Sequence, residues 1–362
     1  MGPQMKIAVL RANALGDLVF SLPALEALRA EFPSAEIVLL GRQWHVTFLG
    51  ERPSPVDRVV AVPGDQWPDA APNALHGDAP WLAATPAERR SFRAAMRAEA
   101  FDIAIQVHGG GRNSNPFLTE LGAALTVGLR SPDAPALDRW VPYVYYQQEV
   151  ARCLEVMALL DARPVSIAPH IELTEADRQA AREAMPIDHP APLAVLHPGA
   201  LDPRRRWPAD RFAALGDRLA SEGLRIVLTG TEAEAPITRA VAAAMAASAL
   251  DLAGRTSMGG LAGIIERASL VVSNDSGPLH LATALRAPTV GIYWCGNMIN
   301  GGPLTRARHR PVISWRTTCP RCGVDCTRTQ CDHRDSFVAE VEVEEVAAAA
   351  RDLLATAASV RR

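Results

Sequence analysis

The chain has 362 residues, a mass of 38.8 kDa, a formal net charge of −3 and a pI near 6.3. This length exceeds what one hydrophobic core usually serves, so we expect two domains of about 150 to 180 residues with a cleft between them. The slightly acidic charge balance argues against a nucleic-acid partner, because proteins that bind polyanions normally carry a strongly basic domain or stripe.

The N-terminal residues lead directly into the apolar run 7–10 and lack the charged start, apolar stretch and cleavage site of a signal peptide. We therefore expect a cytoplasmic protein. The longest apolar candidate for a membrane span, residues 240–250, is alanine-rich and well short of the ~20 residues that cross a bilayer. Any membrane association is then expected to be peripheral, at the inner face of the cytoplasmic membrane.

Apolar runs of strand length alternate with helical patterns in both halves of the chain, which is typical of parallel α/β sheets. In the first half the expected strands are 7–10, 37–40, 59–62 and 103–107, with helices at 22–31 and 87–99. In the second half the expected strands are 193–196, 225–228, 250–252, 270–272 and 289–292, with helices at 208–221, 235–247, 260–267, 279–285 and 343–357. This order predicts two Rossmann-like domains.

Prolines mark two interruptions of this alternation. The proline-rich stretch 63–86 predicts an insertion loop near the mouth of the cleft. A second group of prolines surrounds a short acidic helical segment, 175–184, and predicts a linker at 169–190. The expected domains are therefore 1–168 and 191–362.

The turn after the first expected strand carries Asn13, Gly16 and Asp17 and precedes a helix. Asp17 has two readings: it caps the helix, as Asp often does, or it is a general base in the cleft. The glycine fingerprint G-x-G-x-x-G of dinucleotide-binding domains is absent from the turns after the strands that open the two halves.

Two turns in the second half follow strands and suit an anionic ligand. In the first, Gly199 precedes three consecutive arginines at 204–206, which are either a solvated surface run or guanidinium groups presented to a diphosphate. In the second, Ser273-Asn274-Asp275-Ser276-Gly277 leads into a helix whose N-terminal amides attract phosphate.

These segments together resemble glycosyltransferase family 9, the heptosyltransferases. The resemblance rests on Leu15-Gly16-Asp17 with Pro23, Arg205-Arg206-Trp207-Pro208, Leu252-Ala253-Gly254-Arg255-Thr256-Ser257 and Ser273-Asn274-Asp275-Ser276-Gly277-Pro278-Leu279-His280. It implies a GT-B fold with two facing Rossmann-like domains, an acceptor domain first and a nucleotide-sugar donor domain second. In well-known members the donor is ADP-heptose and the acceptor is the lipid-linked inner core of lipopolysaccharide.

Carried over residue by residue, the family's base falls on Asp17 and its donor-binding acid on Asp275. The donor set then comprises Gly199, Arg205, Asp275, Ser276, Gly277 and His280, although the family often has Lys where this chain has Arg205. His280 either orients the Asp275 loop, contacts the diphosphate or is a structural histidine. No Asp-x-Asp sequence is present, so we expect metal-independent inverting transfer in which Arg205 and helix amides stabilise the leaving diphosphate.

On the acceptor side the candidates are Asn13, Gly16 and His108. His108 follows the strand at 103–107, and the glycines after it suggest close backbone approach to a substrate.

A cysteine-rich segment, 319–333, has the spacing Cys319-x₂-Cys322-x₃-Cys326-x₄-Cys331, with His333 beyond. These four cysteines supply enough ligands for a structural zinc ion, and plain reduced thiols are the alternative. No cofactor is expected for catalysis.

Three other functions remain open at this stage. A dehydrogenase is disfavoured by the missing glycine fingerprint. A family member using another nucleotide-sugar and acceptor fits the same motifs, and so does a nucleotide-sugar-binding protein without turnover.

Overall fold

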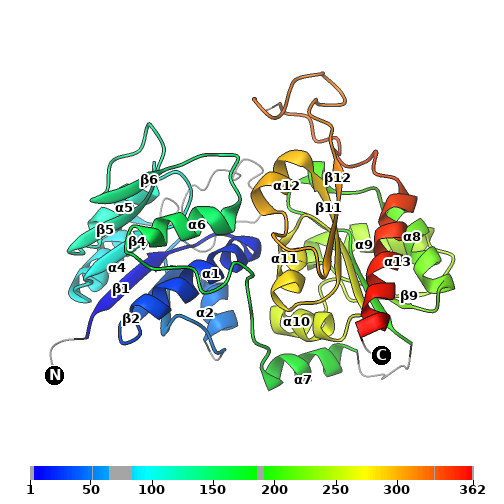
Figure 1. Ribbon diagram of the computed structural model, residues 1–362, viewed down its shortest axis with the longest axis horizontal. Helices are drawn as coiled ribbons and strands as arrows, with labels where there is room; N and C mark the ends of the chain where they lie inside the picture. Colours follow the sequence, from blue (N-terminus) through cyan, green and yellow to red (C-terminus); the bar gives the residue numbers. More distant parts are fainter. Residues whose placement is uncertain (1–3, 51, 65–83, 186–190, 330, 361–362) are drawn as a thin grey trace. The chain divides into compact units, whose positions relative to one another are not determined.

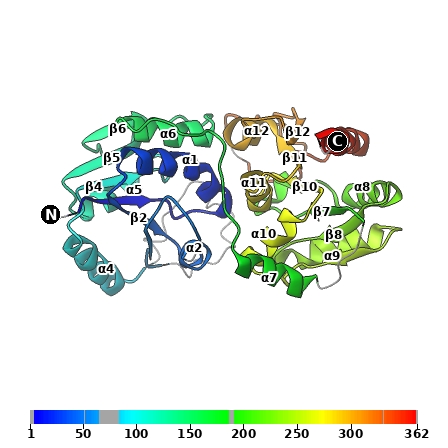
Figure 2. The ribbon, with the colours of Figure 1, turned by 60° about the horizontal axis from the view of Figure 1, so that its bottom comes forward.

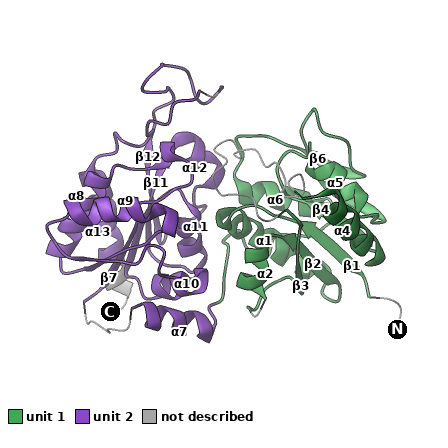
Figure 3. Ribbon diagram, turned by 180° about the vertical axis from the view of Figure 1, so that it is seen from behind, with its two compact units in different colours: residues 1–172 green, residues 173–362 purple. Residues whose placement is uncertain are grey.

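The computed structural model describes residues 4–50, 52–64, 84–185, 191–329 and 331–360. The chain divides into two compact units, Met1–Glu172 and Leu173–Arg362 (Figure 3). Most of the expected insertion loop at 63–86 lies outside the described residues. Among the helices that are described, each is too short or too polar to span a lipid bilayer.

Unit 1 contains a six-stranded parallel sheet with the order β3-β2-β1-β4-β5-β6 (Figure 1). The strands are β1 (Lys6–Leu10), β2 (Glu36–Gly41), β3 (Arg58–Ala61), β4 (Ile103–Gln106), β5 (Leu125–Arg130) and β6 (Arg139–Pro142). The described helices are α1 (Leu15–Glu31), α2 (Gln43–Leu49), α4 (Pro86–Ala98), α5 (Ser114–Glu120) and α6 (Glu149–Ala158).

Helices cover both faces of this sheet, as parallel sheets require. Ala8 and Val38 point to the face that packs on Phe117 of α5 and Met96 of α4. Figure 2 shows α1 and α6 side by side on the other face. Because both faces are covered, the central strands β1 and β2 are apolar after their first residue, and this is why they could be recognised in the sequence.

Unit 2 repeats the same topology in the order β9-β8-β7-β10-β11-β12, again all parallel. The strands are β7 (Leu193–His197), β8 (Arg225–Leu228), β9 (Ala249–Asp251), β10 (Leu270–Asn274), β11 (Thr289–Trp294) and β12 (His309–Ser314). The helices are α7 (Glu175–Ala184), α8 (Ala209–Ser221), α9 (Ala235–Ala244), α10 (Met258–Glu266), α11 (Gly277–Ala284), α12 (Cys295–Gly301) and α13 (Val343–Val360), with short 3₁₀ turns at Pro203–Arg205 and Glu232–Glu234.

The order of the strands positions the candidate site residues. In each sheet the chain runs outward from a central strand to one edge, and then returns to the other side of that central strand. The neighbours β1 and β4, and likewise β7 and β10, therefore send their following loops in opposite directions. In open α/β sheets ligands bind at this switch point, outside the carboxyl ends of the strands.

Three strands that the sequence analysis did not anticipate are β5, β6 and β12. Gly128 interrupts the apolar pattern of β5, and it is glycine because a Cβ there would stand 2.6 Å from Gln106 Cγ. The other two are edge strands, and each contains a proline, Pro142 or Pro311. Proline is tolerated in a sheet mainly at its edges, so it weakens a strand prediction there without preventing the strand.

The helix expected inside the linker, α7, belongs to unit 2 and packs on α10. It begins with a capping box in which Thr174 and Asp177 each accept the other's backbone N–H, at 3.2 and 2.8 Å. The two helices approach closely at Gly263, where a Cβ would stand 2.6 Å from the carbonyl oxygen of Asp177.

We predict that Gly263→Ala lowers the free energy of unfolding by about 1–3 kcal/mol, because the added methyl group forces α7 away from α10. The matched control is Gly260→Ala in the same helix, where the nearest heavy atom, Ser257 Oγ, lies 3.3 Å from the new Cβ. There the added methyl group meets only mild crowding, which includes Ala180 Cβ of α7 at 3.4 Å, and the better helix propensity of alanine opposes it, so stability should change by less than ~1 kcal/mol. Urea denaturation measures both, and equal effects of the two substitutions would contradict the prediction.

Candidate functional site

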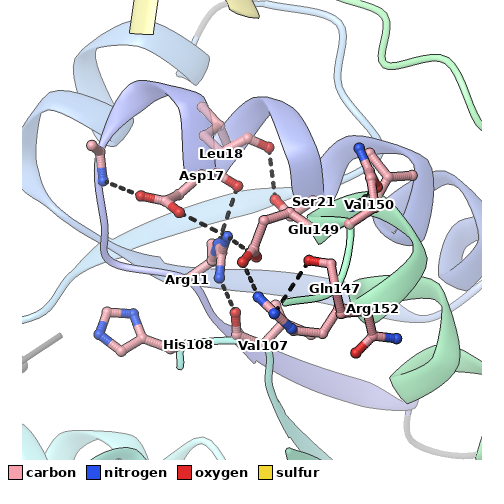
Figure 4. Close-up of polar contacts among 12 residues, drawn as sticks. Arg11, Asp17, Leu18, Ser21, Val107, His108, Gln147, Glu149, Val150 and Arg152 are labelled. Atoms are coloured by element: carbon pink, nitrogen blue, oxygen red, sulfur yellow. Dashed lines mark hydrogen bonds and ion pairs between the residues drawn. The ribbon is translucent and has the colours of Figure 1, made fainter. Parts of the chain in front are cut away.

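A buried arginine organises the carboxyl edge of the first sheet. Arg11 directly follows β1, and its side chain is 3% exposed. Its guanidinium group donates to the carbonyl of Val107 at the end of β4, and it contacts Asp17 at 3.0 Å and Glu149 at 3.2 Å (Figure 4). Since β1 and β4 flank the switch point, this side chain connects the loop after β1 to the loop after β4.

Asp17 lies at the third position of α1, and both of its carboxylate oxygens are engaged. Oδ2 accepts the Ala14 N–H at 3.1 Å, and Oδ1 accepts from Arg11 at 3.0 Å. The side chain is nevertheless 34% exposed, and a carboxylate has about four lone-pair sites. Asp17 therefore caps its helix and can still accept a proton from a bound hydroxyl group, so the two readings of this residue are compatible.

A second buried arginine, Arg152, supports this arrangement from α6. It contacts Glu149 and donates to the carbonyl oxygens of Val144 at 2.6 Å and Tyr145 at 2.9 Å. Glu149 is thus shared between Arg11 and Arg152 (Figure 4). The sequence analysis missed this network, because nothing in the local pattern of α6 distinguishes a buried ion pair from an exposed one.

His108 lies two residues after the end of β4, and it is 3% exposed. Its Nδ1 accepts the Ala12 N–H at 3.1 Å, so the proton of the neutral ring is on Nε2. Burial, together with the positive charge of Arg11, lowers the pKa of His108 to about 4. Nε2 is buried without a hydrogen-bond partner among the described residues, and so is the side-chain oxygen of Asn13.

His45 on α2 has the same properties. It is fully buried, its Nδ1 accepts the Arg42 N–H at 2.9 Å, and its Nε2 has no partner within the described ranges. Burial and the charge of Arg42 lower its pKa to about 3. The sequence analysis did not select His45. Gly16, which it did select, is buried in the first turn of α1.

In unit 2 the corresponding edge is held together by Asn274, the last residue of β10. Its Oδ1 accepts the Trp207 N–H at 2.9 Å, and its Nδ2 donates to the Pro198 carbonyl at 2.8 Å. Trp207 is 1% exposed and donates from its indole to the Val341 carbonyl at 2.9 Å. The loop after β7 is therefore fixed at both of its ends to the turn after β10.

The three consecutive arginines in this loop each have a separate partner. Arg204 pairs with Asp202 at 2.7 Å, and Arg206 donates to the Ala200 carbonyl at 2.8 Å. Arg205 contacts Asp275 at 3.2 Å, and 27% of its side chain is exposed. The run is thus an ordered structure in which Arg205 reaches the turn after β10, rather than a solvated surface patch.

Asp275 is buried between two donors. Its Oδ2 faces Arg205, and its Oδ1 lies 3.0 Å from His280 Nε2 on α11. Burial opposes ionisation of Asp275, but the hydrogen bond from His280 and the charge of Arg205 outweigh it and hold its pKa below the usual value. The structure thus gives His280 a partner in Asp275, one of the roles anticipated for it.

The helix amides expected to face the diphosphate are fewer than the sequence suggested. The Leu279 N–H is taken by the Ser276 carbonyl at 3.1 Å, and Pro278 has no N–H. This leaves the N–H of Gly277, the first residue of α11, without an intrahelical acceptor. The Ser276 hydroxyl lies 3.0 Å from that of Ser273.

Gly199 adjoins Glu234, a carboxylate that the sequence analysis did not select. A Cβ at residue 199 would stand 2.2 Å from Glu234 Oε1, so a larger residue at this position would displace the Glu234 carboxylate. Glu234 also lies 4.0 Å from His197 Nε2. The carboxylate of Glu234 therefore lies next to the predicted donor residue Gly199.

The cysteine-rich loop brings together Cys319, Cys322, Cys331 and His333. Their ligand atoms all lie within 4.8 Å of one another. Cys326 is not a member of this set, although the sequence spacing had included it, and its sulfur lies 3.5 Å from the Val324 carbonyl. The described cysteines are free thiols.

The family model described as glycosyltransferase family 9 (heptosyltransferase) matches residues 89–328. The chain belongs to this family. Over 304 residues this glycosyltransferase is 27% identical to lipopolysaccharide heptosyltransferase 2 of Salmonella typhimurium. The alignment covers 80% of this chain and 82% of that protein.

Two solved structures are similar to this glycosyltransferase. The Escherichia coli ADP-heptose lipopolysaccharide heptosyltransferase II superposes with a TM-score of 0.75 at 20% identity, covering 98% of this chain and 100% of that one. E. coli heptosyltransferase WaaC with ADP-2-deoxy-2-fluoro heptose gives a TM-score of 0.62 at 22% identity, with coverages of 85% and 93%. Together with the two six-stranded sheets, these likenesses confirm the expected GT-B fold.

The lowered pKa of His108 predicts a stability that depends on pH. In the unfolded chain histidine titrates near 6.5, so acidification from about pH 6.5 to 4 adds a proton to the unfolded state first and lowers the free energy of unfolding of this glycosyltransferase. Between pH 7 and pH 5 the wild type loses part of its free energy of unfolding, and we expect His108→Gln to make this loss smaller by about 2 kcal/mol. The control is His170→Gln at an exposed histidine. Chemical denaturation measures the free energy of unfolding at each pH. If it depends on pH in the same way in the wild type and in His108→Gln, the lowered pKa of His108 is contradicted.

Proposed function

We propose that this glycosyltransferase moves heptose from ADP-heptose to an inner-core lipopolysaccharide or related glycan acceptor, with inversion at the anomeric carbon and without a catalytic metal. The observation that carries the proposal is the Asp17 carboxylate, which two donors hold at the carboxyl edge of the first sheet while a third of it stays exposed. ADP-heptose is proposed because WaaC, a similar structure, was solved with ADP-2-deoxy-2-fluoro heptose.

In the proposed reaction the acceptor hydroxyl gives its proton to Asp17 as its oxygen attacks the anomeric carbon. The bond from that carbon to the diphosphate breaks on the opposite side, and ADP leaves with the bonding electron pair. A correctly placed base contributes roughly 10²- to 10⁴-fold to such a step. Arg11 fixes the orientation of the carboxylate, and Glu149, through Arg11, limits the net positive charge beside it.

The acceptor sugar is proposed to contact Asn13 and His108. The Nε2–H of His108 is a donor, and the side-chain oxygen of Asn13 is an acceptor, and both are buried without protein partners in the described part of the chain. A sugar hydroxyl both accepts and donates, so it can satisfy both groups. Leaving a buried polar group unsatisfied costs about 1–3 kcal/mol, and a bound hydroxyl would recover this.

The leaving diphosphate is proposed to bind Arg205 and the Gly277 N–H. Arg205 uses one nitrogen for Asp275 and keeps further donors on a guanidinium fork that suits phosphate oxygens. Asp275 and His280 act as positioning residues. Asp275 contacts Arg205, and His280 holds the Asp275 carboxylate. Ser276 lies in the same turn, and Gly199 leaves room for Glu234 beside the donor.

The setting of the reaction belongs to the same proposal. The acceptor is a lipid-linked glycan, so the enzyme works in the cytoplasm at the inner face of the membrane, with peripheral association at most. No cofactor takes part in the transfer, and a metal bound by the cysteine-rich loop is structural.

The role of Asp17 can be tested with Asp17→Asn. Because the amide cannot take up the hydroxyl proton, kcat should fall by roughly 10²- to 10⁴-fold, while the Kd for ADP-heptose stays nearly unchanged. The matched control is Glu88→Gln, since Glu88 also lies at the third position of a helix, α4, and accepts the N–H of its capping residue Thr85 at 2.7 Å. This control should keep full activity.

Two outcomes would contradict the proposal. If Asp17→Asn lowers stability by about 1 kcal/mol and leaves kcat intact, Asp17 is only a helix cap. If the wild type binds ADP-heptose and transfers heptose to no inner-core acceptor, the chain is a nucleotide-sugar-binding protein or uses another acceptor.

Metal independence can be tested by removing free divalent ions. We expect EDTA to leave the initial rate of transfer unchanged, and added Mg²⁺ or Mn²⁺ to leave it unchanged as well, because Arg205 and the Gly277 N–H stabilise the leaving group instead. The assay measures ADP release over the first turnovers. A rate that EDTA abolishes and Mg²⁺ or Mn²⁺ restores would contradict this.

A further inference from the structure

The cysteine-rich loop follows β12 and stands out from the rest of unit 2 (Figure 1, orange). It starts with a tight hairpin in which the Cys319 N–H donates to the Val324 carbonyl at 2.8 Å, next to an antiparallel bridge between Thr318 and Asp325. Gly323 closes the turn with φ of +71°, a conformation that glycine adopts without strain. The hairpin turns Cys319 and Cys322 toward the same point.

The later part of the loop brings two more ligand atoms to that point. The sulfur of Cys331 and a ring nitrogen of His333 complete a set of four atoms within 4.8 Å of one another. His333 Nδ1 is buried with no hydrogen-bond partner in the described ranges. A tetrahedral zinc ion with Zn–S bonds of about 2.3 Å needs ligand atoms about 3.8 Å apart, so the four groups have to close in by only about 1 Å.

The loop is also connected to the donor turn. The Phe337 N–H donates to the Arg204 carbonyl at 2.8 Å, and the Ser336 hydroxyl donates to the Arg206 carbonyl at 2.6 Å. These two bonds hold the backbone on both sides of Arg205. On the other side of the loop, Arg321 forms a bidentate contact with Asp335, at 2.9 and 3.0 Å.

We propose that Cys319, Cys322, Cys331 and His333 bind one Zn²⁺ ion in a closed structural site, and that this ion positions Arg205 by fixing the chain that leads to Ser336 and Phe337. The second half of the proposal rests on the proposed donor-binding role of Arg205. Three thiols lose their protons on binding, and the resulting site carries one negative charge. These ligands suit zinc rather than a hard cation such as Mg²⁺, because thiolates are soft, imidazole binds zinc well, and Mg²⁺ prefers oxygen ligands.

The ligand set is tested by metal analysis of the full-length chain, expressed with added zinc and purified under reducing conditions. We expect one zinc per chain in the wild type after gel filtration. Cys331→Ser and His333→Ala should each lose it, whereas Cys326→Ser, in the same loop and outside the set, should keep it. Replacing zinc by Co²⁺ should give the intense visible absorption of tetrahedral cobalt thiolate.

Several results would overturn the site. A wild type with no bound metal and all its thiols free rules it out, and so does a disulfide among these cysteines. If Cys326→Ser and Cys331→Ser both lose zinc while His333→Ala keeps it, the ligands are the four cysteines and the proposed set with His333 is wrong. If a variant fails to fold, stripping zinc from the wild type with a strong chelator and adding it back gives the same comparison without substitution.

The positioning role is tested by the Kd for ADP, measured by calorimetry. We expect removal of zinc, or Cys331→Ser, to weaken ADP binding by between about 2- and 30-fold, which is the usual effect of groups that do not contact the ligand themselves. Cys326→Ser should leave ADP binding unchanged. Unchanged ADP binding in the zinc-free protein would refute positioning and leave the metal site standing. A wild type with one zinc and no affinity for ADP would instead refute the proposed donor and not the metal site.

Discussion

The reversal of strand order in each sheet is the constraint on which the candidate site depends. Because β1 and β4 are neighbours and their helices leave in opposite directions, the carboxyl ends of these two strands are not covered by their own connections. The same holds for β7 and β10. Asp17 and His108 follow the first pair of strands, and Gly199 and Asp275 follow the second. Each pair therefore lies at the switch point of its own sheet, although its two members are distant from each other in the sequence.

Buried polar groups keep these open edges rigid. Arg11 in unit 1 and Asn274 in unit 2 have equivalent tasks, since each bonds from one strand of the central pair to the loop of the other. Both are almost fully buried, and a buried polar side chain with its bonds made is costly to displace. Among the described residues, the buried polar atoms without partners, such as His108 Nε2, lie beside these fixed groups.

The sequence supplied the central strands and most helices, because apolar runs with short connections are a local signal. It missed the edge strands β6 and β12, which contain proline and are partly solvated, although it predicted the other two edge strands, β3 and β9. It also missed α6, whose Glu149 and Arg152 look like ordinary surface charges. It grouped Cys326 with the other three cysteines, whereas the ligand atoms that gather within 4.8 Å of one another include His333 and not Cys326. Spacing alone cannot show which of five neighbouring ligands a hairpin turns inward.

The sequence by itself determined the family, the two α/β sheets and the turns that carry the candidate residues, because these depend on short motifs and on residues close together in the chain. Tertiary structure alone decided what each side chain touches. It paired Arg205 with Asp275 and put Glu234 against Gly199, contacts that join residues from different loops. The physical reason is that hydrogen bonds, ion pairs and burial depend on distance in space, and parallel sheets bring distant segments of the chain to one edge.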